Sequence, residues 1–154
     1  MRKVLLTLAA SLAIATPALA NEARVEARGG VYWSPGHTDG TVGAAVGYDF
    51  DLGTSAFAGA EVSGDKVLDS THNRIAWGFT GRVGVKPSPG DKLFAAAGYT
   101  TKPCSLCESA THLGAGYEHN FASRLYGKVE YRHFFVHNGA PDANAVSAGL
   151  GIKF

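Results

Sequence analysis

Charged side chains spaced two residues apart are the first feature of this chain that could do chemistry. In an extended segment alternate side chains share one face, so such charges gather on a single side of a strand. Inside a closed sheet, opposite charges of this kind would pair with one another. Two runs have this spacing, Arg24, Glu26 and Arg28 and then Lys128, Glu130 and Arg132. The full set on the same predicted face also includes Glu61, Arg74, Arg82, Glu118 and Lys153.

The composition of this set supports two interpretations. Seven members are basic and four are acidic, which predicts a basic excess. The structural interpretation is an ion-paired network that fills a narrow barrel, because eight strands leave room for little more than side chains. The functional alternative is a narrow path for solutes with a weak preference for anions.

Cys104 and Cys107 are separated by two residues and are the two cysteines of the chain. In an exported protein two such thiols are expected to pair, because compartments outside the cytoplasm are oxidising. We therefore predict a disulfide that stiffens a loop, and no metal site. Metal binding is the alternative, and it would need two further ligands, for which His72 and His112 are candidates.

His133, His137, Asn138 and Gly139 raise an enzyme hypothesis. Lipid A deacylases are also small barrels, and their active-site stretch resembles H-x-S-N-A near the end of the chain. Here the serine is missing, and a histidine without a nucleophile to activate cannot run that chemistry. We predict no catalytic residue, no cofactor and no enzyme, with a lipid A-modifying enzyme as an alternative.

The elements that position these residues are predicted to be strands. Apolar residues alternate with small or polar ones in eight segments, and a period of two is the signature of a strand. The segments are 23–33, 41–50, 54–62, 73–86, 91–101, 110–120, 123–136 and 143–154.

The connections between these segments alternate in length. Tight turns are predicted near 51–53, 87–90 and 121–122, and longer polar loops at 34–40, 63–72, 102–109 and 137–142. Short turns at one end and long loops at the other are typical of outer-membrane barrels.

Alternation alone does not say which face of the sheet is outside. A soluble periplasmic barrel would turn its apolar side chains inward around a ligand. In this chain the face opposite the apolar one combines charges with many glycines, which suits a cramped interior better than an exposed face. We therefore expect the apolar face to contact lipid, with the soluble ligand-binding barrel as the alternative.

The first twenty residues have the features of an export signal. Arg2 and Lys3 precede an apolar run, and Ala18 and Ala20 supply small residues for cleavage. We predict a signal peptide at 1–20 and a single barrel domain at 21–154. The formal net charge of +1 gives no support for nucleic-acid binding.

The last two predicted strands carry a family resemblance. Residues 129–134 read Val-Glu-Tyr-Arg-His-Phe, and a glycine-rich strand ending in Phe154 follows. The chain resembles opacity-type, porin-like small outer-membrane barrels, and in layout the transmembrane domain of outer membrane protein A. The resemblance implies that Phe154 is an assembly signal read by the barrel assembly machinery.

These observations predict an all-β protein, an eight-stranded antiparallel up-and-down transmembrane β-barrel in the outer membrane of a Gram-negative bacterium. The expected role is that of a porin-like surface protein, mainly structural or acting through contacts of its loops. Its expected partners are outer-membrane lipid and lipopolysaccharide, together with a surface ligand that the sequence does not identify.

Overall fold

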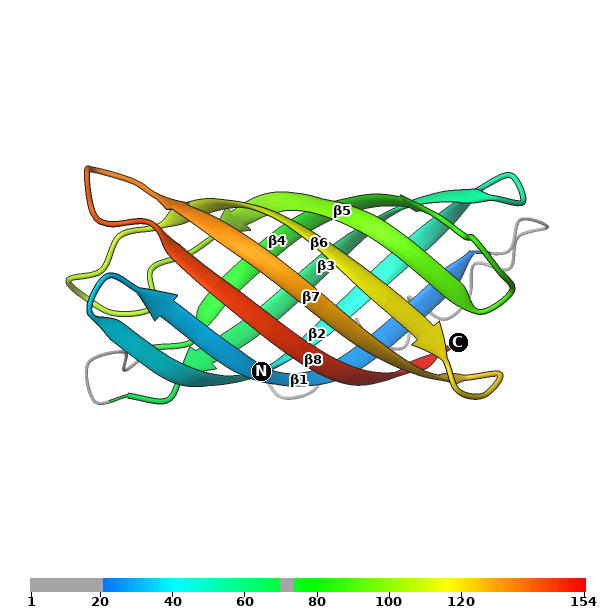
Figure 1. Ribbon diagram of the computed structural model, residues 1–154, viewed down its shortest axis with the longest axis horizontal. Coiled ribbons are helices and arrows are strands. Elements are labelled where there is room, and N and C mark those ends of the chain that lie inside the picture. Colours follow the sequence, from blue (N-terminus) through cyan, green and yellow to red (C-terminus); the bar gives the residue numbers. More distant parts are fainter. Residues whose placement is uncertain (1–20, 70–73) are drawn as a thin grey trace, which may run out of the picture.

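The computed structural model describes residues 21–69 and 74–154, and the predicted signal peptide at 1–20 lies outside the described residues. The described chain forms eight strands joined in sequence order (Figure 1). They are β1 (Glu22–Ser34), β2 (His37–Leu52), β3 (Ala56–Val67), β4 (Ala76–Val85), β5 (Asp91–Thr100), β6 (Ala110–Asn120), β7 (Leu125–Val136) and β8 (Ala143–Lys153).

The sheet closes on itself. Each strand pairs antiparallel with the next, and β1 also pairs antiparallel with β8, for example through Arg24 and Lys153. Closure leaves no unpaired edge, which is how a sheet satisfies its backbone hydrogen bonds in lipid. The predicted eight-stranded antiparallel barrel is confirmed.

One predicted loop is wrong. Residues 34–40 were expected to form a long loop, but β1 continues to Ser34 and β2 begins at His37. Pro35 and Gly36 make the connection, and Gly36 has a positive φ of 81°. Proline followed by a glycine of positive φ is a favoured centre of a tight turn, so two residues suffice. The predicted loop at 63–72 also begins later, because β3 continues to Val67.

The two ends of the barrel differ. One end carries the tight turns 53–55, 86–90 and 121–124, and we call it the turn end. The other carries the connections 35–36, 101–109 and 137–142, and we call it the loop end. In Figure 1 the loop end is at the left, and the chain terminus at Phe154 lies toward the right.

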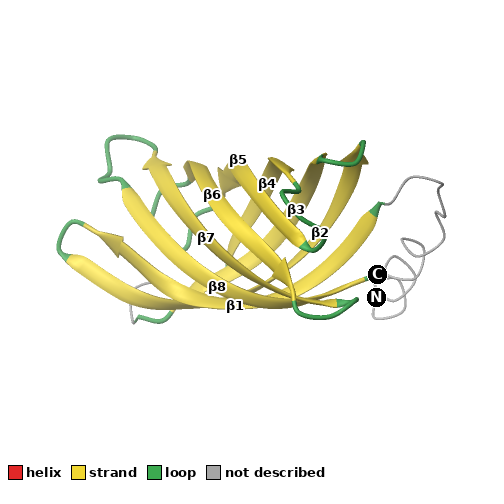
Figure 2. Ribbon diagram, turned by 45° about the vertical axis from the view of Figure 1, so that its right-hand side comes forward, coloured by secondary structure: helices red, strands yellow, loops and turns green. Residues whose placement is uncertain are grey.

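The apolar side chains point outward, as predicted. Val46, Phe79 and Leu150 lie on the outer wall and are 54%, 53% and 62% exposed. On each strand the alternate, more buried side chains point into the barrel. Figure 2 shows the strands curving around to form this barrel. Among the described residues, no helix has the length and apolar character needed to cross a membrane. The soluble alternative, with an apolar interior and a polar outer wall, does not fit this orientation.

Glycines on the inner wall make room for long charged side chains. A Cβ atom at Gly47 would lie 2.6 Å from Nη2 of Arg24, and one at Gly149 would lie 2.8 Å from the carboxyl carbon of Glu26. The narrow lumen therefore holds large charged residues because the strands around them carry no side chain at the points of closest approach.

Candidate functional site

The inner wall gathers the predicted charged residues. All of the predicted set except Arg74 have side chains on this wall, and each is at most 9% exposed. Arg74 is a correction to the set, because β4 begins only at Ala76 and Arg74 is exposed. Its backbone N–H donates to the carbonyl of Pro103 in the neighbouring loop.

Four charged residues that sequence analysis missed complete this set. Asp49, Lys92 and Asp65 lie on inward positions of β2, β5 and β3, and Glu22 starts β1. Following the inward face of each strand to its ends would have found them, because they keep the same two-residue spacing.

The completed set changes the charge balance of the lumen. Its ion pairs join seven basic residues to seven acidic ones, so the basic excess predicted from the sequence is not present. The bases are Arg24, Arg28, Arg82, Lys92, Lys128, Arg132 and Lys153, and the acids are Glu22, Glu26, Asp49, Glu61, Asp65, Glu118 and Glu130.

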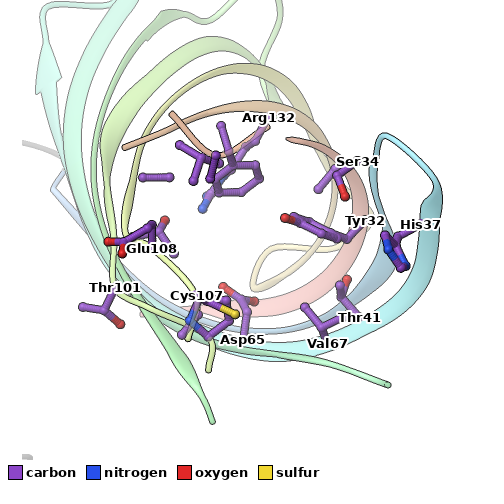
Figure 3. Close-up of a pocket in the computed structure, with 18 of the residues that line it drawn as sticks. Tyr32, Ser34, His37, Thr41, Asp65, Val67, Thr101, Cys107, Glu108 and Arg132 are labelled. Atoms are coloured by element: carbon purple, nitrogen blue, oxygen red, sulfur yellow. The ribbon is translucent and has the colours of Figure 1, made fainter. Parts of the chain in front are cut away.

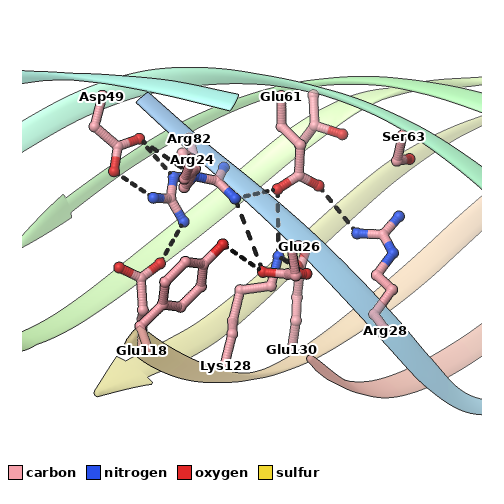
Figure 4. Close-up of polar contacts among 12 residues, drawn as sticks. Arg24, Glu26, Arg28, Asp49, Glu61, Ser63, Arg82, Glu118, Lys128 and Glu130 are labelled. Atoms are coloured by element: carbon pink, nitrogen blue, oxygen red, sulfur yellow. Dashed lines mark hydrogen bonds and ion pairs between the residues drawn. The ribbon is translucent and has the colours of Figure 1, made fainter. Parts of the chain in front are cut away.

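Glu61 on β3 is the centre of the network (Figure 4). Oε2 of Glu61 lies 2.8 Å from Nη1 of Arg24, and Oε1 lies 3.0 Å from Nη1 of Arg28. From β7, on the opposite side of the eight-stranded barrel, Lys128 approaches Glu61 at 3.3 Å and Arg132 at 2.9 Å. One carboxylate therefore bridges the lumen from wall to wall.

A second group of ion pairs crosses the lumen toward the turn end. Nζ of Lys92 on β5 lies 2.6 Å from Glu22 on β1, the strand opposite, and 2.8 Å from Asp49. Asp49 also accepts hydrogen bonds from Arg82, and Glu118 accepts one from Arg82 at 3.1 Å.

Aromatic rings close the space around these charges. The guanidinium of Arg82 lies 5.2 Å from the ring centre of Phe57 and 5.0 Å from that of Phe94. Nζ of Lys153 lies 4.9 Å from the ring of Tyr126, whose hydroxyl donates to Glu26 at 3.0 Å. Cations over aromatic faces gain further stabilisation, particularly away from water.

A cavity of about 460 Å³ opens above the network at the loop end (Figure 3). Arg28, Asp65 and Arg132 form its charged inner end. Its walls are mainly apolar inward residues, namely Tyr32, Val67, Ala76, Ala110, Phe134 and Val136. The 101–109 loop and residues near the β1–β2 turn form its rim.

The predicted disulfide is confirmed in the loop at the rim. Cys104 and Cys107 are joined, and their Cα atoms are 5.0 Å apart. Glu108 ties the loop to its surroundings, because it pairs with Lys102 at 2.9 Å and accepts a hydrogen bond from Asn138 at 3.0 Å. The contact with Lys102, followed by that with Asn138, lowers the pKa of Glu108.

Replacing both cysteines with serine is expected to loosen this loop and to affect the barrel little. A closed loop this short contributes at most about 2 kcal/mol in the chain-entropy model. Leu106 lies between the cysteines and is 96% exposed, so chymotrypsin should cut after it faster in the C104S/C107S protein than in the oxidised protein. Mass spectrometry after reduction measures that rate, and equal rates would show that the disulfide does not restrain the loop.

His112, one of the two histidines considered as metal ligands, is engaged in hydrogen bonds with threonines. Both ring nitrogens of His112 are hydrogen-bonded at 3.0 Å, Nε2 to Thr80 and Nδ1 to Thr100. His72 lies outside the described residues. No group of three or more possible metal-ligating residues occurs within 21–69 and 74–154.

His133 and His137, the histidines of the enzyme hypothesis, form no catalytic triad with a serine within the part of the chain that the structure describes. His133 lies on the outer face of β7, where Nδ1 is 2.8 Å from the Asn144 side-chain oxygen. Nδ1 of His137 is 3.3 Å from the hydroxyl of Ser109, and both groups are exposed. The carboxylate of Glu108, which precedes Ser109, is bound by Lys102 and Asn138, whereas a triad would need a carboxylate that orients the histidine.

Phe154 follows β8 at the turn end. Its side chain is 72% exposed, and its backbone N–H donates to the carbonyl of Ala23 at 2.9 Å. The final residue is therefore fixed to the first strand and presents its ring on the outside.

Residues 6–154 match the protein family described as "Outer membrane protein beta-barrel domain". No curated protein sequence matches the chain.

Solved structures with a similar fold include the following three. The N-terminal barrel of Pseudomonas aeruginosa OprF is 17% identical to this chain and has a TM-score of 0.65. The match covers 86% of this chain and 97% of the OprF barrel. Neisserial surface protein A has 11% identity and a TM-score of 0.59, covering 87% and 97%. The outer membrane enzyme PagL has 15% identity and a TM-score of 0.53, covering 84% and 98%. At these identities the similarity shows the fold alone.

Proposed function

Because the chain belongs to the outer membrane protein beta-barrel domain family, we propose that it is a surface barrel that conducts no solutes and makes its contacts at the loop end. The observation that carries this proposal is the pair of ion bridges across the lumen, from Glu61 to β7 and from Lys92 to β1. A solute crossing the barrel would have to separate these buried charges.

The energetics of buried charges support a closed lumen. Separating one partner from a buried ion pair costs about 3–5 kcal/mol when the other charge stays unpaired. The side chains of Arg24, Glu26 and Glu118 have no exposed surface, so water does not replace their partners without rearrangement. The equal numbers of bases and acids also remove the reason for expecting anion preference.

The terminal segments of the chain fit the same proposal. Residues 1–20 serve as the export signal, and Phe154 is the residue that the barrel assembly machinery reads. The exposed ring of Phe154 at the end of the last strand supports the second assignment. Outer-membrane lipid surrounds the apolar wall, and lipopolysaccharide is the proposed neighbour of the loop end.

The purified protein is expected to give no stepwise current in planar lipid bilayers at neutral pH, because charged side chains bridge the lumen. Insertion is verified in the same preparation by protection of the strands from protease. A porin added afterwards to the same bilayer must give current steps. Reproducible steps from this protein would reject the closed barrel, and anion selectivity of those steps would favour the narrow anion path.

A further inference from the structure

The cavity at the loop end is lined differently from the rest of the lumen. Toward the turn end, inward positions carry paired charges, whereas the cavity walls carry Tyr32, Val67, Phe134 and Val136. The rings of Tyr32 and Phe134 lie 6.1 Å apart, on β1 and β7. The volume of about 460 Å³ lies within the usual range for sites that hold small organic ligands.

The inner end of the cavity offers a hydrogen-bond donor. Arg132 donates from Nε to Glu130 and from Nη2 to Glu61 at 2.9 Å, so Nη1 is not used in these ion pairs. Arg132 and Arg28 both line the cavity, and Figure 3 shows Arg132 among the lining residues. A guanidinium with a nitrogen that takes no part in these ion pairs is suited to a carboxylate, which accepts charge-assisted hydrogen bonds.

Asp65, the acidic residue at the inner end of the cavity, already accepts hydrogen bonds from neighbouring side chains. Both carboxylate oxygens of Asp65 accept hydrogen bonds from Arg28, at 2.8 and 2.5 Å, and Oδ2 also accepts one from Ser63 at 3.0 Å. A cationic ligand would have to displace these donors. The cavity therefore favours an anionic head group over a cationic one.

Polar contacts join the loops at the rim of the cavity. Within the disulfide loop Glu108 pairs with Lys102, and it joins this loop to the 137–142 connection through the hydrogen bond from Asn138. The backbone N–H of Val136 donates to Asp142 at 3.0 Å and fixes the other side of that connection. A site built in advance loses little free energy on ordering when a ligand binds.

From these features we propose that the cavity binds an amphipathic monocarboxylate, an alkyl chain with one carboxylate, that enters from the loop end. The chain lies against Tyr32 and Phe134, and the carboxylate accepts a hydrogen bond from Nη1 of Arg132. The site goes beyond the proposed surface role, because it lies inside the barrel mouth and does not require a closed or an open lumen.

Inward and outward side chains alternate along β7, so the position of a label on this strand shows which face of the barrel the probe reached. Phe134 and Val136 line the cavity, whereas Phe135 between them is 45% exposed on the lipid wall. The protein in phospholipid nanodiscs is incubated with decanoic acid carrying a diazirine in its chain and is then irradiated. Fragmentation of the labelled peptides in a mass spectrometer locates the label at single residues, and so separates labelling inside the barrel from labelling by probe dissolved in the lipid.

Labelling is expected at Phe134 and Val136, and excess decanoate should reduce it at least about tenfold, whereas decanol at the same concentration should not. The variant A110F places a ring in the cavity and should lower the inner labelling by a similar factor. The matched variant A115F makes the same change on the outward face of β6 and should leave the inner labelling unchanged.

Labelling confined to Phe135 and other outward residues would overturn the proposal. Equal competition by decanol would overturn the role of the carboxylate, and this test uses the unaltered protein, so it stands even if A110F fails to fold. If the barrel conducted in planar bilayers, the probe would still be expected to label Phe134 and Val136 inside it. Failure of the ligand site and failure of the closed barrel are therefore distinguishable.

Discussion

Replacing Glu61 with glutamine is expected to lower the free energy of unfolding by about 3–5 kcal/mol. Glutamine keeps the size of the side chain and removes the charge that four cations share. Arg24 would then lose its closest carboxylate, and the repulsion among Arg24, Arg28, Lys128 and Arg132 would be offset less in a space that water scarcely reaches. Denaturant unfolding of the protein in lipid vesicles, followed by the fluorescence of Trp33 and Trp77, measures the change.

Glu108→Gln is the matched control for this experiment. It makes the same chemical change in an ion pair at the loop end, where Lys102 is 49% exposed and solvent screens the interaction. The control is expected to unfold like the unaltered protein. If E61Q unfolds at the same denaturant concentration as E108Q, the network is not the main source of stability within the lumen.

Replacing Gly98 with alanine is expected to destabilise the barrel by about 1–3 kcal/mol through overpacking against backbone. A Cβ atom at this position would lie 2.1 Å from the carbonyl oxygen of Phe79 and 2.8 Å from Cα of Thr80. Both atoms belong to the neighbouring strand β4, so the clash cannot be relieved by turning a side chain. The same unfolding measurement applies, together with the mobility of unboiled protein on gels.

Gly81→Ala is the control for Gly98. It lies on β4, and its Cβ atom would meet nothing closer than the carbonyl oxygen of Ala97 at 3.8 Å. Alanine there should leave stability unchanged or raise it by up to about 1 kcal/mol, because alanine loses less backbone freedom on folding. Equal stability of G98A and G81A would mean that the strands of this barrel separate easily enough to admit a methyl group.

Strand positions were predicted best where the alternation is uninterrupted. The segment 110–120 coincides with β6, and 91–101 differs from β5 by one residue. The prediction was wrong at Pro35 and Gly36, because a polar stretch around a tight turn resembles a loop although the strands on both sides continue to pair. Composition does not distinguish a polar loop from polar strand ends that extend beyond the lipid.

The charged set was predicted less completely than the fold. Glu61 and Arg132 could be placed on the inner wall from spacing, but Asp49 and Lys92 were overlooked at the ends of their strands. Since Arg74 was also included in the set, the predicted charge balance of the lumen was wrong. The cavity was not foreseen, since its walls come from inward positions of strands far apart in the chain.

The sequence by itself determined which side chains face lipid and which face the lumen, because the two-residue period is a local property of an extended backbone. Only the tertiary structure decided which charges meet. Glu61 pairs with Arg132, seventy-one positions away, because closure and the stagger of the strands bring β3 and β7 to the same height on opposite walls. That stagger belongs to the whole sheet, and no segment of the sequence contains it.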